Sequence, residues 1–127
     1  MFMQQDWLMR QIEMMTAAIA QLLFGKDGKG REQSEVLEQE QSALLSQKLT
    51  DLIHEGRLGK AEDLVFDALD GMDQGALALA VEFYRQANEM SDGELEAQGF
   101  TREELWEGLG EAVARYGLYF PGFWDKA

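Results

Sequence analysis

Residues 76–84 have the sequence Ala-Leu-Ala-Leu-Ala-Val-Glu-Phe-Tyr, and this stretch decides the fold. Alanine and leucine favour helix, and in a helix this segment would be apolar on most sides. A helix without a broad polar face belongs in the middle of a bundle. We therefore expect a helix that Asp73 caps and that is the most buried element of the protein.

Upstream, a first helix is expected over about residues 4–24, where apolar residues recur at steps of three and four. They are Leu8, Ile12, Met15, Ile19 and Leu22. The stripe is widened by Trp7, Met14, Ala18 and Leu23. It is wide enough to pack on two partners, so this helix lies either against its own domain or against another subunit.

Between this helix and residue 76 we expect a linker and two more helices. Residues 25–31 are rich in glycine and lysine and are typical of a flexible polar linker. The second helix is expected over about residues 32–55, because this segment lacks Gly and Pro until Gly56. The third should follow Arg57 and end before Gly71, with one apolar face: Ala61, Leu64, Val65, Ala68 and Leu69.

Downstream, two helix starts are marked by capping boxes, in which a Ser or Thr and a Glu three residues later bond each other's backbone N–H groups. Ser91 with Glu94 predicts a short helix that ends near Gln98, and Thr101 with Glu104 predicts the last helix. That helix carries Leu105, Trp106, Leu109, Val113 and Tyr116 and ends at Gly117. Its internal glycines, Gly108 and Gly110, weaken it but permit close approach of a neighbour.

The segment from Tyr116 to Trp124 is unusually aromatic, with five aromatic residues in nine positions. We favour the interpretation that it folds back over the edge of the core. The alternative is an exposed anchor, since aromatic side chains dominate protein interfaces.

Together these features predict an all-α fold, a helical bundle of five or six helices in one domain of residues 1–127. Within it we assign residues 1–24 to the amphipathic helix, 32–117 to the helical core and 118–127 to the aromatic tail. No sustained alternation of apolar and polar residues suggests a strand, and the sequence has one proline in 127 residues.

Two resemblances add to this prediction. Residues 42–75 resemble one tetratricopeptide-like hairpin, with Ala61 and Ala68 at the two alanines of its second helix, although Leu45, Leu49 and Leu52 replace the preferred Trp, Gly and Tyr. The resemblance implies a helical hairpin, and a single unit carries the peptide-binding role of that family only weakly. Residues 5–13 and 22–26 are also similar to a family of small uncharacterised bacterial helical proteins, which implies no activity.

Charge narrows the possible partners. The net charge is −13, and residues 61–127 carry four Lys and Arg against fifteen Asp and Glu. Nucleic-acid binding relies on phosphate neutralisation by Lys and Arg, so we expect no nucleic-acid partner, and for the same reason no anionic membrane partner. The opening residues lack the basic start and apolar run of a signal peptide, so we expect a cytoplasmic protein.

The residues that usually carry chemistry are absent or wrongly spaced. There is no cysteine and the single histidine, His54, lacks the second histidine of a zinc-protease helix. The glycines and lysines of residues 25–30 do not have the order of a phosphate loop. Residues 88–99 lack key ligands of a calcium loop, so a capped turn is the better interpretation. We therefore expect no catalytic, cofactor-binding or metal-binding residues and no cofactor.

The function favoured by these observations is a non-enzymatic protein–protein interaction or scaffold module, self-associating as a homo-oligomer, with its protein partner unknown. The candidate interaction residues are Trp7, Leu8, Ile12, Met15, Ile19, Tyr119, Phe120, Phe123 and Trp124. Two alternatives stay open: a small-molecule-binding protein or enzyme with a pocket lined by Tyr84, Trp106 and carboxylates, and an acidic regulator that binds a basic protein.

Overall fold

The computed structural model describes residues 5–24, 36–71 and 75–124, and in these ranges it contains six helices and no strand. The helices are α1 (Gln5–Phe24), α2 (Val36–His54), α3 (Leu58–Asp70), α4 (Ala76–Asn88), α5 (Asp92–Ala97) and α6 (Arg102–Arg115). This confirms the all-α bundle. The linker assigned to residues 25–31 and the ends of the chain, residues 1–4 and 125–127, lie outside the described residues.

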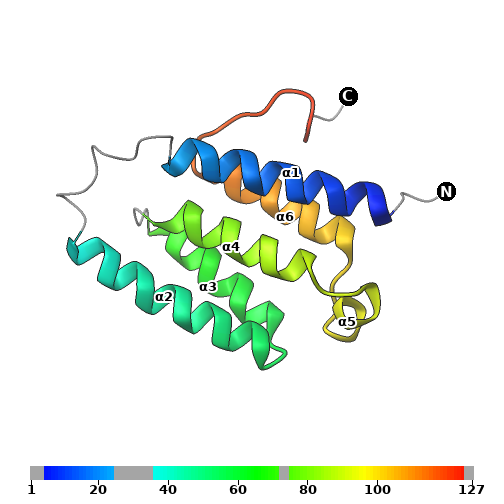
Figure 1. The fold of residues 1–127 in the computed structure, drawn as a ribbon, viewed down its shortest axis with the longest axis horizontal. Helices are drawn as coiled ribbons and strands as arrows, with labels where there is room; N and C mark the ends of the chain where they lie inside the picture. Colours follow the sequence, from blue (N-terminus) through cyan, green and yellow to red (C-terminus); the bar gives the residue numbers. More distant parts are fainter. Residues whose placement is uncertain (1–4, 25–35, 72–74, 125–127) are drawn as a thin grey trace.

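Helix α4 is the centre of the bundle, as the sequence predicts (Figure 1). It packs against α1, α2, α3 and α6. Its buried residues are Ala76, Leu77, Leu79, Ala80, Val81, Phe83, Tyr84, Ala87 and Asn88. The expected cap, Asp73, lies outside the described residues; the N-cap position of α4 is occupied by Gly75, which makes no side-chain cap.

Four of the other five described helices are arranged in two pairs around α4, and the short α5 lies at one end of the bundle (Figure 1). Helices α2 and α3 form a hairpin, and α1 lies along α6. The turn between α2 and α3 includes Gly56, whose φ of 78° is a left-handed conformation that glycine adopts without strain. The hairpin places the small side chains of Ala61 and Ala68 in the core.

The two predicted capping boxes are both present. The Ser91 hydroxyl accepts a hydrogen bond from the Glu94 N–H, and the Thr101 hydroxyl accepts one from the Glu104 N–H. Each Glu side chain returns a bond to the backbone N–H of its cap residue. Residues 88–99 therefore contain a capped turn at Ser91, the short helix α5 and the start of the connection to α6.

Candidate interaction surface

Helix α1 has two apolar stripes that meet different surroundings. Successive residues of a helix are about 100° apart around its axis. The residues of the inner stripe therefore lie within about 60° of one another, and the centre of the outer stripe lies about 90° around the helix from the centre of the inner stripe. The inner stripe consists of Leu8, Ile12, Met15 and Ile19, all of them buried. The outer stripe consists of Trp7, Gln11, Met14, Ala18 and Leu22.

Four of the predicted interaction residues belong to the inner stripe and lie in the core. Leu8, Ile12, Met15 and Ile19 are at most 3% exposed, because α1 packs on α4 and α6 of its own chain. In this fold they form the core and are not available to another molecule. The helix therefore packs within its own domain, which the sequence left open.

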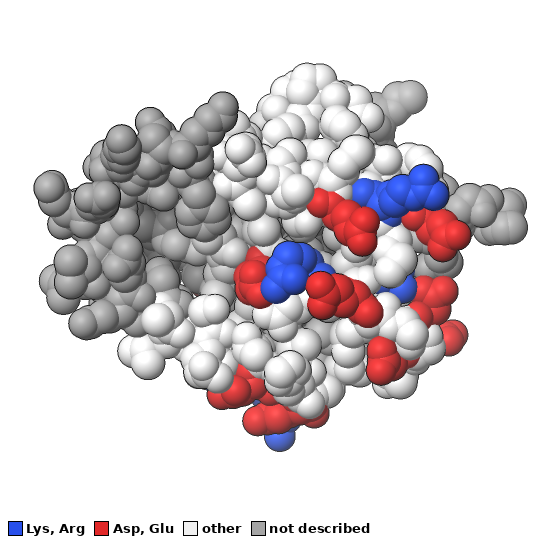
Figure 2. Space-filling view, in the orientation of Figure 1, with Lys and Arg blue, Asp and Glu red and all other residues white. Residues whose placement is uncertain are grey.

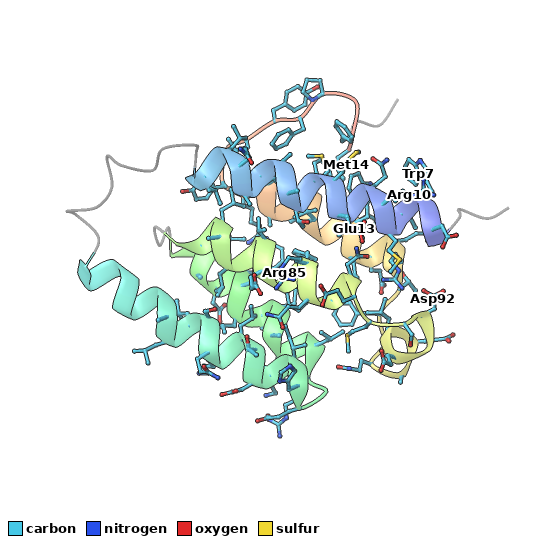
Figure 3. The ribbon with its side chains drawn as sticks, in the orientation of Figure 1. Trp7, Arg10, Glu13, Met14, Arg85 and Asp92 are labelled. Atoms are coloured by element: carbon cyan, nitrogen blue, oxygen red, sulfur yellow. The ribbon has the colours of Figure 1, made fainter. Side chains whose placement is uncertain are left out.

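The outer stripe is accessible. Trp7 is 47% exposed, Met14 51% and Leu22 61%. Figure 3 shows Trp7 and Met14 along the edge of α1 on the side where the tail runs, with Glu13 on the opposite edge. Large apolar side chains that share one helix face and remain exposed are typical of a contact surface.

The aromatic tail folds back onto α6. The indoles of Trp124 and Trp106 stack with centroids 4.4 Å apart, and the Trp124 Nε1–H donates to the Trp106 carbonyl oxygen over 2.8 Å. Gly110 makes this possible, since a Cβ there would lie 2.5–2.7 Å from indole atoms of Trp124. Phe120 and Trp124 pack against the core, so these two candidates belong to the fold.

The outward side of the tail remains exposed. Tyr119 is 70% exposed and Phe123 38%, although Phe123 also contacts the Trp106 ring edge-on at 6.4 Å. We define the apolar surface as the exposed residues of the outer stripe and the tail: Trp7, Met14, Leu22, Tyr119 and Phe123. Two of the predicted tail residues, Tyr119 and Phe123, are thus accessible for contact, and Met14 and Leu22 join them.

Apart from its Trp7 end, where Asp6 and Arg10 lie, the surroundings of the apolar surface carry little charge. Between Met14 and Phe24, and between Tyr116 and Trp124, the sequence has no Asp, Glu, Lys or Arg. Figure 2 shows uncharged atoms over the tail and the C-terminal part of α1, and charged side chains over α4 and the N-terminal part of α1. In a chain of net charge −13, this region is where a contact would bury no carboxylate.

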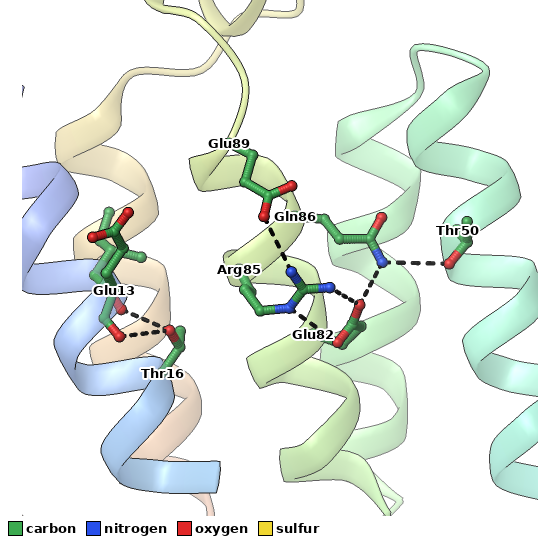
Figure 4. Close-up of polar contacts among 8 residues, drawn as sticks. Glu13, Thr16, Thr50, Glu82, Arg85, Gln86 and Glu89 are labelled. Carbon is green, nitrogen blue, oxygen red and sulfur yellow. Dashed lines mark hydrogen bonds and ion pairs between the residues drawn. The ribbon is translucent and has the colours of Figure 1, made fainter.

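The charged face over α4 is internally paired (Figure 4). The Arg85 guanidinium donates to the carboxylates of Glu82 and Glu89, and its hydrogen bond to Glu82 lowers the pKa of Glu82. The Gln86 amide donates to Glu82 over 2.7 Å and to the Thr50 hydroxyl of α2 over 3.4 Å. This network ties α4 to α2 and has no feature that selects a ligand.

The rings of Tyr84 and Trp106, which the small-molecule-binding alternative places in one pocket, do not lie together. The Tyr84 hydroxyl lies against Gly108. Trp106 instead stacks on Trp124 of the tail, on the side of α6 that includes Gly110. Because Trp106 and Gly108 are about 200° apart around α6, the two rings lie on opposite sides of that helix.

Instead, Tyr84 is paired with a carboxylate. Its hydroxyl donates to Glu62 Oε2 over 2.6 Å. Burial, together with the charges of Glu62 and Glu111, raises the pKa of the Tyr84 phenol. Burial also raises the pKa of Glu62, and repulsion from Asp63 and Glu104 adds to this, while the Tyr84 hydrogen bond opposes it. The pair joins α3 to α4 beneath α6.

Sequence reasoning missed the buried Arg102 at the start of α6. Its guanidinium donates to the Asn88 carbonyl over 2.7 Å, to the Met90 carbonyl over 3.0 Å and to Asp92 over 2.6 Å. The Asn88 amide in turn donates to the Met9 carbonyl of α1 over 3.1 Å. A positive charge in the first turn of a helix is unfavourable because of the helix dipole. The position of Arg102 is therefore a signal in the sequence that this side chain has a partner elsewhere in the fold.

Neither a metal centre nor a membrane-spanning helix lies in the part of the chain that the structure describes. It contains no group of three or more His, Asp or Glu side chains placed to hold a metal ion. None of its helices combines the length and the apolar character needed to cross a membrane. His54 is exposed at the end of α2.

Comparison with known proteins gives one relationship. Neither the curated proteins nor the solved structures include one that matches this chain. Residues 2–117 match the family of unknown function DUF6483, and this range contains all six described helices. The match agrees with the resemblance to small uncharacterised helical proteins, and the chain belongs to the DUF6483 family.

Proposed function

We propose that this protein is a non-enzymatic protein–protein interaction or scaffold module that associates with copies of itself. The observation that carries the proposal is the apolar surface, in which five large side chains are 38–70% exposed. Exposed aromatic residues on a rigid support are typical of interface anchors. The tail has that support because Trp124 stacks on α6.

Charge supports a second copy as the occupant. Two chains of charge −13 repel each other, so they can meet only where carboxylates are few. The apolar surface meets this condition over most of its area, since residues 14–24 of α1 and residues 116–124 include no Asp, Glu, Lys or Arg. A basic partner would instead gain most from the acidic faces of the molecule.

Two further parts of the proposal concern the hairpin and the compartment. We propose that the α2–α3 hairpin is tetratricopeptide-like, supported by the buried small residues Ala61 and Ala68. We also propose a bacterial cytoplasmic protein, supported by the absence of cysteine and by the resemblance of its first helix.

Light scattering on the purified chain over a range of concentrations tests self-association. A deletion of α1 is unsuitable, because it would remove Ile12 and Ile19 from the core. The variant Leu22→Glu instead places a charge on the apolar surface. Leu44→Glu is the matched control, since Leu44 is 72% exposed on α2, outside that surface.

We expect the parent chain and Leu44→Glu to exceed the monomer mass of 14.4 kDa as concentration rises, and Leu22→Glu to stay at that mass. A parent chain that remains monomeric throughout would refute the proposal. Capture of a basic protein that weakens between ~0.1 M and ~1 M salt, with a monomeric parent, would favour the acidic-regulator alternative.

A further inference from the structure

We propose that two copies of this chain pair through the outer stripes of α1, with the two helices antiparallel and a two-fold axis next to Met14. This inference rests on the proposed self-association and specifies its geometry. The starting observation is that the outer stripe is nearly symmetric about its own centre.

The stripe has the spacing of a helix–helix seam. Its members follow one another at steps of four, three, four and four residues, which keeps them on one face. In reverse order the stripe pairs Trp7 with Leu22, Gln11 with Ala18 and Met14 with itself. A two-fold contact requires this kind of self-complementarity, because each residue pair occurs twice.

The sizes of the paired residues also match. The large Trp7 ring would lie against the second copy's Leu22, and Gln11 against the small Ala18 side chain of the second copy. Met14 would lie beside the second copy's Met14 at the axis, where its flexible thioether can adapt to its own image. Trp7, Met14 and Leu22 are each about half exposed, so they can make these contacts without rearrangement of the core.

The charges of α1 select the antiparallel orientation. All its charged residues, Asp6, Arg10 and Glu13, lie in the first half of the helix. Arg10 borders the outer stripe, three residues after Trp7 and four before Met14, so a parallel pair would place it near the second copy's Arg10 with like charges facing each other. An antiparallel pair places this charged half opposite the uncharged half of the second copy.

The expected contact is modest in size. A helix of 20 residues is about 30 Å long. A contact along one face of such a helix buries less surface than the roughly 800 Å² per partner of a stable interface. The tail runs beside α1 (Figure 1), and its exposed residues Tyr119 and Phe123 extend the apolar area. We therefore expect a reversible dimer whose population depends on concentration.

Cysteine cross-linking tests the geometry directly, because the chain has no cysteine of its own. Single variants Met14→Cys, Trp7→Cys, Leu22→Cys and Leu44→Cys are treated with a mild oxidant at a concentration where light scattering shows association. A disulfide requires Cα atoms within about 7 Å. Circular dichroism of each variant checks that the helical fold is kept.

The antiparallel pair predicts that Met14→Cys forms covalent dimers alone, while Trp7→Cys and Leu22→Cys form them only when mixed. Leu44→Cys should stay uncross-linked. Efficient dimers of Trp7→Cys alone and of Leu22→Cys alone would establish a parallel pair and overturn the inference.

Self-association and the antiparallel pairing of α1 are refuted by different results. A parent chain that associates by light scattering, with no α1 variant cross-linking alone or mixed, leaves self-association standing and overturns the α1 pairing. A parent chain that stays monomeric overturns both.

Discussion

The close approach of α6 to the Tyr84–Glu62 pair gives a sharp prediction for Gly108→Ala. A Cβ at this position would lie 2.9 Å from Glu62 Oε2 and 3.0 Å from Tyr84 Cζ, and closer still to the Tyr84 hydroxyl oxygen. Tyr84 is fully buried, and its 2.6 Å hydrogen bond holds Glu62 in place. The added methyl group must therefore displace the pair or move α6.

The free energy of unfolding should fall by about 1–3 kcal/mol. Alanine is favoured over glycine inside a helix by about 1 kcal/mol. Overpacking a core costs about 1–3 kcal/mol. Loss of the hydrogen bond between Tyr84 and the partly buried Glu62 adds about 1 kcal/mol. The steric and hydrogen-bond costs together outweigh the gain in helix propensity.

Urea unfolding followed by circular dichroism measures this loss. Gly59→Ala on α3 is the control, because a Cβ there meets no atom within 4 Å, and we expect it to be neutral or to stabilise by up to ~1 kcal/mol. In the Tyr84→Phe background, where the nearest atom is gone, Gly108→Ala should cost at least ~1 kcal/mol less. Equal costs in both backgrounds, or a stabilised Gly108→Ala, would refute the reasoning.

Three other changes test the tail, the buried arginine and the buried carboxylate. Gly110→Ala should displace the Trp124 indole, seen as a red shift of tryptophan emission and faster proteolysis of the tail; unchanged emission would contradict it. Arg102→Ala should lower the free energy of unfolding by about 2–6 kcal/mol in urea titration, because it leaves the Asn88 and Met90 carbonyls without their donor, at about 1–3 kcal/mol for each. The pKa of Glu62 is raised in the fold, so its protonated form is favoured there over its carboxylate form. The contribution of Glu62 to the free energy of unfolding is therefore greatest below the usual pKa of 4.5 and falls as the pH rises through the pKa of the folded state. In Glu62→Gln the unfolding midpoint should fall less over this rise in pH, and an identical pH profile would show that the carboxylate is not responsible.

Local sequence patterns were sufficient to predict most of the helices. The spacing of apolar residues predicted a helix over about residues 4–24, where α1 is Gln5–Phe24, and a helix between Arg57 and Gly71, where α3 is Leu58–Asp70. Both capping boxes were predictable because a cap and its partner are three residues apart in the chain. The central place of α4 followed from a segment with no broad polar side.

The candidate site was predictable only in part. The periodicity of α1 showed a wide apolar stripe, but it could not show which half α4 and α6 would cover. The buried half, with Ile12 and Ile19, was therefore predicted as interaction surface together with the exposed Trp7. The tail was correctly expected to fold back, and its inner and outer residues separated only in the structure.

What the sequence by itself determined was therefore the set of helices, their caps, the absence of cysteine chemistry and the uneven charge. These depend on neighbours within a few residues or on composition alone. Tertiary structure decided the partners of Gly108, the burial of Arg102 and the split of α1 into a core half and an exposed half. Those contacts join residues far apart in the chain, and which of them form depends on how the whole bundle packs.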